Sequence, residues 1–410
     1  MNSSSPIQTS EHQTGTRRSI PFDIRRSPLS LIIAALFIAV SGLSILGISV
    51  VVLNGRAAAS HDFISYWATG QQLVHGQNPY DPQSILMVER SAGFELQDRV
   101  LMMRNPPTAL FLTIPLGFMP ARAASIFWTL LLAACLILSV EILRRQDNGE
   151  RSNLYLIGYC FAPALANLAT GQTGVFSLLG IVLFLRFLKS HPLIAGISLS
   201  LCAIKPHLFL PLAAVLLVWI FARKAYSVLV GAVLALASEC LVALWFDASV
   251  WRHYLTMMRV DGIRNEFVPT LGTLFRFSIH QQAMWLQFMP AVLACAWALY
   301  YFYRHRRNWD WQDHAPLLIL VSLVTAPYAW FSDQAIGLAA ILPTVRPSRK
   351  LIPLLALMSA ASIEMLAHVS FHSQVYLWQG IAWLAWYLYA AKRQESPPES
   401  SGGANSGVKS

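Results

Sequence analysis

The sequence predicts an all-α polytopic membrane protein, that is, a chain of helices that crosses a bilayer many times. The 410-residue chain is 55% hydrophobic and only 12% charged, whereas an ordinary soluble chain is roughly 45–50% apolar and roughly 25% charged. Several apolar runs, such as 29–53 and 226–246, have about the 20 residues that a helix needs to cross a bilayer. The alternating pattern of a membrane β-barrel is absent. A cytosolic enzyme, a disulfide-stapled secreted module and a disordered chain are therefore excluded.

Helices placed on the apolar runs give about twelve crossings, within a range of about 10–12. The predicted spans are residues 29–53, 123–143, 152–168, 174–188, 192–204, 207–222, 226–246, 284–303, 315–331, 334–345, 350–370 and 373–391. Residues 1–28 form a basic N-terminal tail and residues 29–391 one transmembrane domain. Residues 392–410, rich in Ser, Pro and Gly, are expected to be a disordered tail.

The basic residues predict the orientation. With the N-terminus inside, about two-thirds of the 30 Lys and Arg residues fall on the inner side, and the acidic residues show no such bias. Both termini are therefore expected in the cytoplasm. The formal net charge of +10 is then a marker of topology, and no nucleic-acid partner is expected.

Two long hydrophilic connections, 54–122 and 247–283, both fall on the predicted outer side. The first contains an apolar stretch, residues 106–120, which prolines interrupt too often for a span. This stretch suits helices that lie in or dip into the outer interface. Because the inner connections are short and basic, the functional residues are expected on the outer face.

Neither a metal site nor a cofactor site is expected from local motifs. The five cysteines all fall inside apolar runs without CxxC spacing, which favours small core residues over metal ligands or disulfides. No stretch resembles a P-loop, a Rossmann glycine fingerprint, a zinc-ligand pair or a nucleophile elbow.

The first outer connection carries a carboxylate beside an imidazole, Asp62 and His61, followed by aromatic residues that include Tyr66. This arrangement supplies a general base, a second proton acceptor and a surface on which a sugar ring can stack. The alternative is that Asp62 caps the helix that follows it. The segment from Asn78 to Pro82 is a turn signal and is expected to be structural.

Further polar residues stand at the outer ends of predicted spans. Arg104 is expected either to hold a lipid phosphate or to anchor in the headgroups. Gln172 belongs to a turn with hydrogen-bonding side chains at the outer rim, and the alternative is that this is only a tight turn. Lys205, followed by His207, is a cation at the end of two apolar runs and needs a partner; a phosphate is a natural one, and a headgroup anchor is the alternative.

Three acidic residues complete the candidates. Asp333 lies at the outer boundary beside aromatic residues, where it can orient a base, bind sugar hydroxyls or cap the next helix. Glu239 and Glu364 fall within predicted spans, which would suit the ion site of a transporter or of a flippase for lipid-linked sugars. The absence of an inverted repeat argues against that alternative.

The order of these motifs resembles the polyprenyl-phosphate-dependent glycosyltransferases of family 87, formerly a domain of unknown function, over roughly residues 60–345. The matching elements are His61-Asp62 with Tyr66, Gly76-x-Asn78-Pro79-Tyr80, Asn105-Pro106-Pro107 with Pro115-Leu116, Gly171-Gln172, Lys205-Pro206, and Pro327-Tyr328 followed by Asp333. Each motif is short, but together they share one order and one predicted side of the membrane.

The resemblance implies a GT-C fold in the bacterial inner membrane and an active site that faces the periplasm. It implies inverting transfer of a sugar (mannose, arabinose or similar) from a polyprenyl-phosphate donor to a lipid or glycan acceptor, without a nucleotide or other cofactor. Asp62 matches the family's general base. Lys205 and Arg104, with His207 as a weaker third, are candidates to stabilise the departing phosphate. Some mannosyltransferase relatives carry histidines near the position of Asp333, so the resemblance does not fix the sugar.

Overall fold

The computed structural model describes residues 62–93, 100–146, 153–260, 266–345, 348–368 and 373–395. Within these ranges the regular structure consists of helices, and no strand is present. The predicted N-terminal tail, the predicted first span at 29–53 and most of the predicted C-terminal tail lie outside the described residues.

The first predicted outer connection folds into short helices. They are α3 (Phe63–Val74), α4 (Pro82–Ser91), the 3₁₀ helix η1 (Pro107–Leu112) and α5 (Ile114–Gly117). Two glycines let α3 and α5 touch backbone to backbone, because a Cβ atom on Gly70 would lie 2.2 Å from the carbonyl oxygen of Thr113 and one on Gly117 would lie 2.3 Å from that of Gly70. The apolar stretch 106–120 therefore forms two short helical pieces, broken at its prolines.

The remaining helices follow in chain order. They are α6 (Ala121–Gln146), η2 (Asn153–Cys160), α7 (Ala162–Thr170), α8 (Gly174–Phe187), α9 (Pro192–Ser198), η3 (Pro206–Phe209), α10 (Leu210–Arg223), α11 (Tyr226–Phe246), α12 (Val250–Val260), α13 (Leu271–Ile279), α14 (Trp285–His305), η5 (Arg306–Asn308), α15 (Trp311–Thr325), η6 (Phe331–Gly337), α16 (Leu338–Val345), η7 (Arg349–Leu351), α17 (Ile352–His368), η8 (Ser373–Tyr376) and α18 (Leu377–Glu395). The last helix thus continues to Glu395, four residues into the predicted tail.

Four helical stretches among the described residues are long and apolar enough to cross a membrane, judged by length and composition: Ala121–Gln146, Pro206–Arg223, Tyr226–Phe246 and Trp285–Asn308. Each coincides with a predicted span. The prediction of an all-helical chain is confirmed for the described residues, whereas twelve crossings and a GT-C fold stay predictions.

Several predicted spans differ from the helices in the structure. The run 192–204 contains the seven-residue helix α9 followed by turns, and the run 315–331 ends as a helix at Thr325, ahead of Pro327. Apolar composition alone does not separate a continuous helix from a short helix followed by an apolar turn.

The long helices leave apolar surface that no other part of the described chain covers. Only 17% of the 18-residue apolar stretch of α11 is buried. Trp245 and Leu241 in this helix are 86% and 67% exposed. Contiguous apolar surface of this kind is rare on water-soluble monomers, so these helices indicate a membrane protein.

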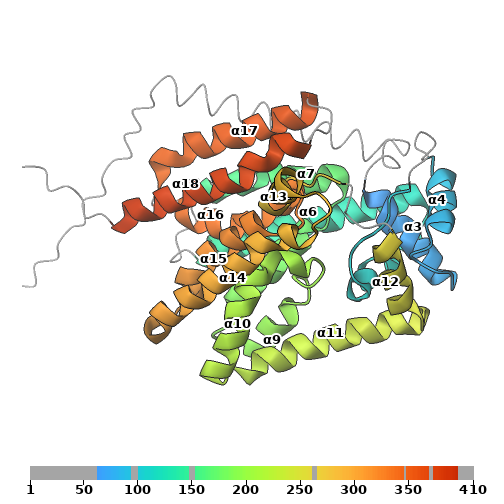
Figure 1. The fold of residues 1–410 in the computed structure, drawn as a ribbon, viewed down its shortest axis with the longest axis horizontal. Helices are drawn as coiled ribbons and strands as arrows, with labels where there is room; N and C mark the ends of the chain where they lie inside the picture. The colour runs from blue at the N-terminus through green and yellow to red at the C-terminus, as the bar shows by residue number, and fades with distance from the viewer. Residues whose placement is uncertain are drawn as a thin grey trace, which may run out of the picture.

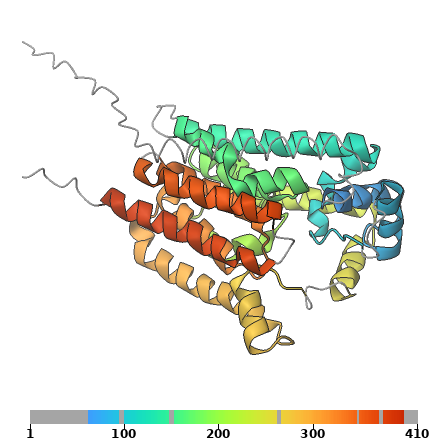
Figure 2. The same cartoon turned by 90° about the horizontal axis from the view of Figure 1, so that it is seen from above.

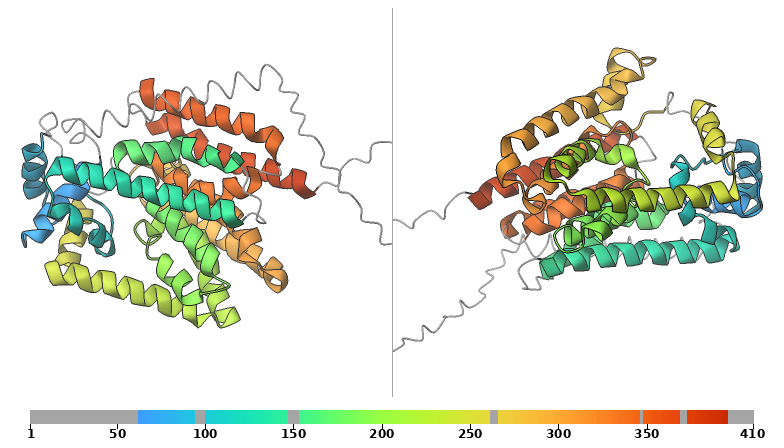
Figure 3. Two further views of the ribbon diagram at one scale, coloured as in Figure 1. Left: turned by 180° about the vertical axis from the view of Figure 1, so that it is seen from behind. Right: turned by 90° about the horizontal axis from the view of Figure 1, so that it is seen from below.

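Helices α3 and α4 of the first predicted outer connection and α12 of the second gather at one end of the molecule (Figure 1). Helix α13, also from the second connection, packs against α14 instead. Figure 3 shows α6 and α11 running along the molecule toward that end. Helices α17 and α18 lie side by side away from it (Figure 2). The short helix η6 packs against α7 and α8, and this junction positions the candidate site.

Candidate functional site

Asp62 lies at the start of α3, where its backbone and side chain have separate roles. Its carbonyl oxygen accepts hydrogen bonds from the amide and the hydroxyl of Ser65, at 3.1 and 2.8 Å. Its carboxylate makes no capping hydrogen bond; instead Oδ2 accepts from Nε2 of Gln172 at 2.5 Å. The side-chain cap weighed as an alternative for Asp62 is therefore wrong.

The turn that carries Gln172 is fitted closely against α3. Helix α7 is followed by Gly171 with φ +78°, a left-handed conformation that favours glycine. A Cβ atom there would lie 2.5 Å from Cβ of Phe63. Nε1 of Trp128 donates to the carbonyl oxygen of Gly171 at 2.7 Å. Glycine is required here by both conformation and space, and this close approach brings Gln172 to Asp62.

The amide of Gln172 is held in one orientation by its neighbours. Its Oε1 accepts from Nζ of Lys205 at 2.9 Å and from the hydroxyl of Tyr66 at 3.3 Å. With two donors at the oxygen, the nitrogen faces Asp62 as a donor. Burial raises the pKa of Tyr66 above its ordinary value, which keeps its hydroxyl protonated.

Lys205 and Asp333 form a buried ion pair. Nζ of Lys205 lies 2.7 Å from Oδ1 of Asp333, and the two residues are only 6% and 0% exposed. The other carboxylate oxygen accepts from the backbone amide of Trp330 at 2.9 Å and so caps η6. Burial alone would lower the pKa of Lys205, but the attraction of Asp333, together with the influence of Tyr66 and Tyr328, raises that pKa above its ordinary value.

These side chains form one continuous polar network, which consists of Asp62, Tyr66, Gln172, Lys205 and Asp333. Four separate parts of the chain contribute to it: the start of α3, the turn between α7 and α8, the residue before η3, and η6. The sequence selected all five residues individually, and the structure brings them together.

The other predicted site residues lie outside this network. Arg104 makes a bidentate ion pair with Glu266, both N–O distances being 2.8 Å, and lies 3.5 Å from the hydroxyl of Tyr328. His207 meets the ring of Tyr328 edge to face, with centroids 5.6 Å apart. Arg104 and His207 therefore both contact Tyr328. His61 lies outside the described residues.

Two residues that the sequence did not indicate as site residues, Glu266 and Asn105, connect the first outer connection to the rest of the site. Glu266 comes from the second outer connection, where an isolated acid gave no signal of its own. Nδ2 of Asn105 donates to the carbonyl oxygen of Ile204 at 2.9 Å, one residue before Lys205. Asn105 belongs to the Asn-Pro-Pro motif, which was the available signal.

Residues 104–327 match the model of glycosyltransferase family 87. The chain belongs to glycosyltransferase family 87. No curated protein and no solved structure matches it. The family 87 segment contains Arg104, Gln172, Lys205 and His207, whereas Asp62 and the other network residues flank it.

Membership of family 87 supports a membrane glycosyltransferase over the transporter weighed from the sequence. Glu239 lies in α11, and the side chain of Glu364 lies outside what the structure describes. In the described part of the chain, no group of three or more His, Cys, Asp or Glu residues could hold a metal ion.

Proposed function

We propose that this family 87 protein transfers a sugar, such as mannose or arabinose, from a polyprenyl-phosphate donor to a lipid or glycan acceptor at the periplasmic side of the bacterial inner membrane. The observation that carries the proposal is the fixed position of the Asp62 carboxylate beside Gln172, an amide of the matched family segment. We assign Asp62 as the general base.

The chemistry is a single displacement. The carboxylate of Asp62 takes the proton of the acceptor hydroxyl while the acceptor oxygen forms a bond to the anomeric carbon. The bond between that carbon and the phosphate oxygen breaks on the opposite face, so the anomeric configuration inverts. A base held in one position is an advantage here because the reacting groups must be aligned before the proton moves.

Departure of the polyprenyl phosphate leaves negative charge that a cation can stabilise. Arg104 is the candidate that the geometry favours. Its partner in the structure, Glu266, carries one negative charge and accepts hydrogen bonds from both terminal nitrogens of the guanidinium, as a phosphate would. We propose that the donor phosphate replaces Glu266 on Arg104, beside Tyr328 and His207. The exchange of one anion for another requires no net change of charge.

Lys205 has a different role in this proposal. It is buried and neutralised by Asp333, and it donates to Gln172, which in turn donates to Asp62. Lys205 and Gln172 are therefore positioning residues for the base. The shared end of α3, α4 and α12 would then face the periplasm, as the distribution of basic residues predicts.

The test uses the purified protein in lipid nanodiscs with a radiolabelled polyprenyl-phosphate sugar and envelope lipid extract as acceptor. Asp62→Asn should reduce transfer by about 10²–10⁴-fold, the usual contribution of a general base. Asp310→Asn is the matched control because Asp310 also stands at the start of a helix, but its carboxylate caps α15 through the backbone amide of Gln312 and pairs with Lys189. Full activity of Asp62→Asn would refute its assignment as base.

Glu239→Gln tests the transporter alternative in the same preparation. The carboxyl of Glu239 lies in α11 and belongs to neither the polar network nor the Arg104 pair. Transfer should therefore stay at the wild-type rate. Loss of function in this variant, together with an active Asp62→Asn, would favour transport over glycosyl transfer.

A further inference from the structure

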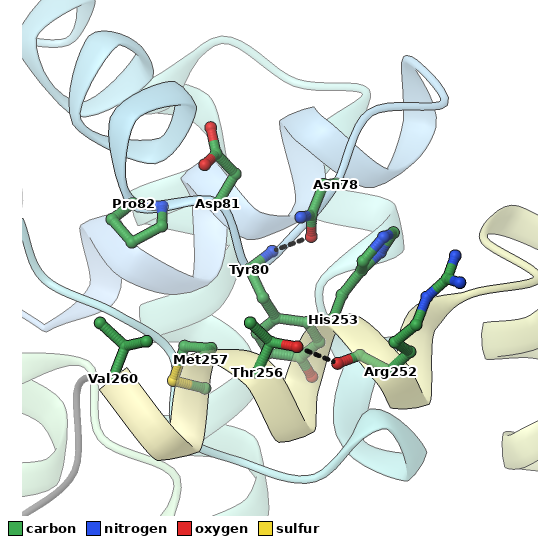
Figure 4. Close-up of a pocket in the computed structure, with 9 residues that line it drawn as sticks. All are labelled: Asn78, Tyr80, Asp81, Pro82, Arg252, His253, Thr256, Met257 and Val260. Atoms are coloured by element: carbon green, nitrogen blue, oxygen red, sulfur yellow. Dashed lines mark hydrogen bonds between the residues drawn. The ribbon is translucent and has the colours of Figure 1, made fainter.

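A cavity of about 240 Å³ lies between the first outer connection and α12. Figure 4 shows Tyr80 extending from the first outer connection toward α12, while the carboxylate of Asp81 points away from that helix. The lining residues are Asn78, Tyr80, Asp81, Pro82, Arg252, His253, Thr256, Met257 and Val260. None of them belongs to the polar network, so the cavity is a separate feature of the same end of the molecule.

The lining combines an apolar floor with hydrogen-bonding groups. Tyr80 and Met257 are buried, at 2% and 3% exposure, and the ring of Tyr80 packs against that of Tyr254 with centroids 5.4 Å apart. Oδ1 of Asn78 accepts from the backbone amide of Tyr80 at 2.9 Å, which leaves the NH₂ group of the amide as a donor. The hydroxyl of Thr256 donates within α12 and keeps its lone pairs as acceptors. An apolar face edged by donors and acceptors matches a sugar ring, which has CH groups on its faces and hydroxyls at its edge.

The charges of the lining favour a neutral ligand over a phosphate. The lining holds one formal positive charge, that of Arg252, and one formal negative charge, that of Asp81, which sum to zero. Each is hydrogen-bonded to a residue outside the lining: Arg252 donates to the hydroxyl of Ser249, and Asp81 accepts from the backbone amide of Ser84. Nδ1 of His253 lies 2.6 Å from Oδ2 of Asp247, and this carboxylate would balance a protonated ring. A phosphate would meet no excess of positive charge here, in contrast to the guanidinium of Arg104.

The size of the cavity sets the size of the ligand. A volume of about 240 Å³ corresponds to roughly eight water molecules at about 30 Å³ each. It is smaller than the roughly 300–1,000 Å³ of pockets that enclose drug-sized ligands. A single sugar ring suits this space better than an oligosaccharide or an acyl chain does.

The floor of the cavity is joined to the segment that carries the proposed phosphate ligand. The hydroxyl of Tyr80 donates to the carbonyl oxygen of Asn105 at 3.2 Å, and that of Tyr254 lies 3.5 Å from the carbonyl oxygen of Arg104. A ligand seated on Tyr80 is therefore linked, through the hydrogen bond of the tyrosine hydroxyl, to the short stretch of backbone that presents Arg104. This placement suits the second substrate of the reaction.

We propose that this cavity is an acceptor subsite that binds one neutral sugar ring of a glycan acceptor. The inference rests on the proposed glycosyl transfer and narrows its acceptor to a carbohydrate. It separates the two substrates in space, with the charged donor at Arg104 and the neutral acceptor ring on Tyr80.

The test fills the cavity and compares the two substrates. Thr256→Trp places an indole among the lining residues, and Leu255→Trp is the matched control, because Leu255 is 51% exposed on the same helix and does not line the cavity. Initial rates are measured in nanodiscs with neutral methyl glycosides as acceptors. Thr256→Trp should raise the acceptor KM about tenfold or more while the donor KM and kcat stay within twofold.

Three results would overturn the subsite: an unchanged acceptor KM in Thr256→Trp, an equal rise in Leu255→Trp, or a rise in the donor KM instead. Direct binding separates this inference from the proposed function. Saturation-transfer NMR with the same neutral methyl glycosides should show contact with the wild-type protein and its loss in Thr256→Trp, whether or not the preparation transfers sugar. Absence of transfer from every polyprenyl-phosphate sugar would refute the proposed function, whereas absence of glycoside binding to the wild type would refute the subsite.

Discussion

The buried pair of Lys205 and Asp333 yields the most quantitative prediction. Two unit charges 2.7 Å apart attract by about 6 kcal/mol at an effective dielectric constant of about 20. Asp333→Asn removes this attraction and leaves an ammonium group that is 6% exposed, with Gln172 as a remaining acceptor. Since removing one partner of a buried pair costs roughly 3–5 kcal/mol, we expect Asp333→Asn to lower the free energy of unfolding by about 3–5 kcal/mol.

The measurement is reversible unfolding in mixed micelles, followed by tryptophan fluorescence or circular dichroism. The double variant Lys205→Met, Asp333→Leu should recover most of the loss, because uncharged side chains need no ionic partner. Asp310→Asn is the control. It breaks the pair of Asp310 with Lys189, whose side chain is 72% exposed, and should cost about 1 kcal/mol or less. A cost below about 1 kcal/mol for Asp333→Asn, or additive costs in the double variant, would refute the description of a buried charged pair.

Three further variants test other parts of the structure. Gly171→Ala introduces a Cβ atom 2.5 Å from Cβ of Phe63 at φ +78° and should lower stability by about 1–3 kcal/mol in thermal unfolding, together with loss of transfer. Burial raises the pKa of the Glu89 carboxyl to about 7, so this carboxyl keeps its proton in the folded state at pH values where it has lost it in the unfolded state. The free energy of unfolding should therefore fall by up to about 3 kcal/mol as the pH rises from 4.5 to 7. The same pH series on Glu89→Gln should lack this fall. Glu266→Gln should release Arg104 for the donor phosphate and lower the donor KM in steady-state kinetics, and an increased donor KM would contradict that exchange.

The sequence predicted the members of the polar network but not their pairing. The prediction placed Lys205 at the outer rim with a need for an anionic partner, and a phosphate was the expected one. The structure supplies Asp333 instead, 128 positions away along the chain. Local pattern and charge distribution indicate which side of a membrane a residue occupies, whereas the choice between two anions at one site depends on tertiary packing.

The helix bounds were likewise predicted correctly where they depend on the local sequence, and wrongly where they depend on contacts between distant parts of the chain. Continuous apolar runs such as 226–246 predicted α11 with its observed bounds, because nothing within the run interrupts a helix. The run 315–331 was predicted as one span, but α15 ends at Thr325 and the chain turns through Pro327 before η6. The end of α15 at Thr325 and the turn through Pro327 place Asp333 in the first turn of η6, where it reaches Lys205. The wrong prediction of one continuous span and the missed partner of Lys205 therefore have the same cause.

The ion pairs Lys205–Asp333 and Arg104–Glu266 differ in burial, and this difference bears on which of the two cations could bind the donor phosphate. Lys205 and Asp333 are almost completely buried, so a phosphate that replaced Asp333 would leave an uncompensated carboxylate inside the protein, at a cost of several kcal/mol. Arg104 and Glu266 are 20% and 21% exposed, so Glu266 can return to solvent when it leaves Arg104. These exposures support the proposed exchange of anions at Arg104 and argue against one at Lys205. The family resemblance offered Lys205 and Arg104 together as candidates for the phosphate, and this comparison of burial favours Arg104.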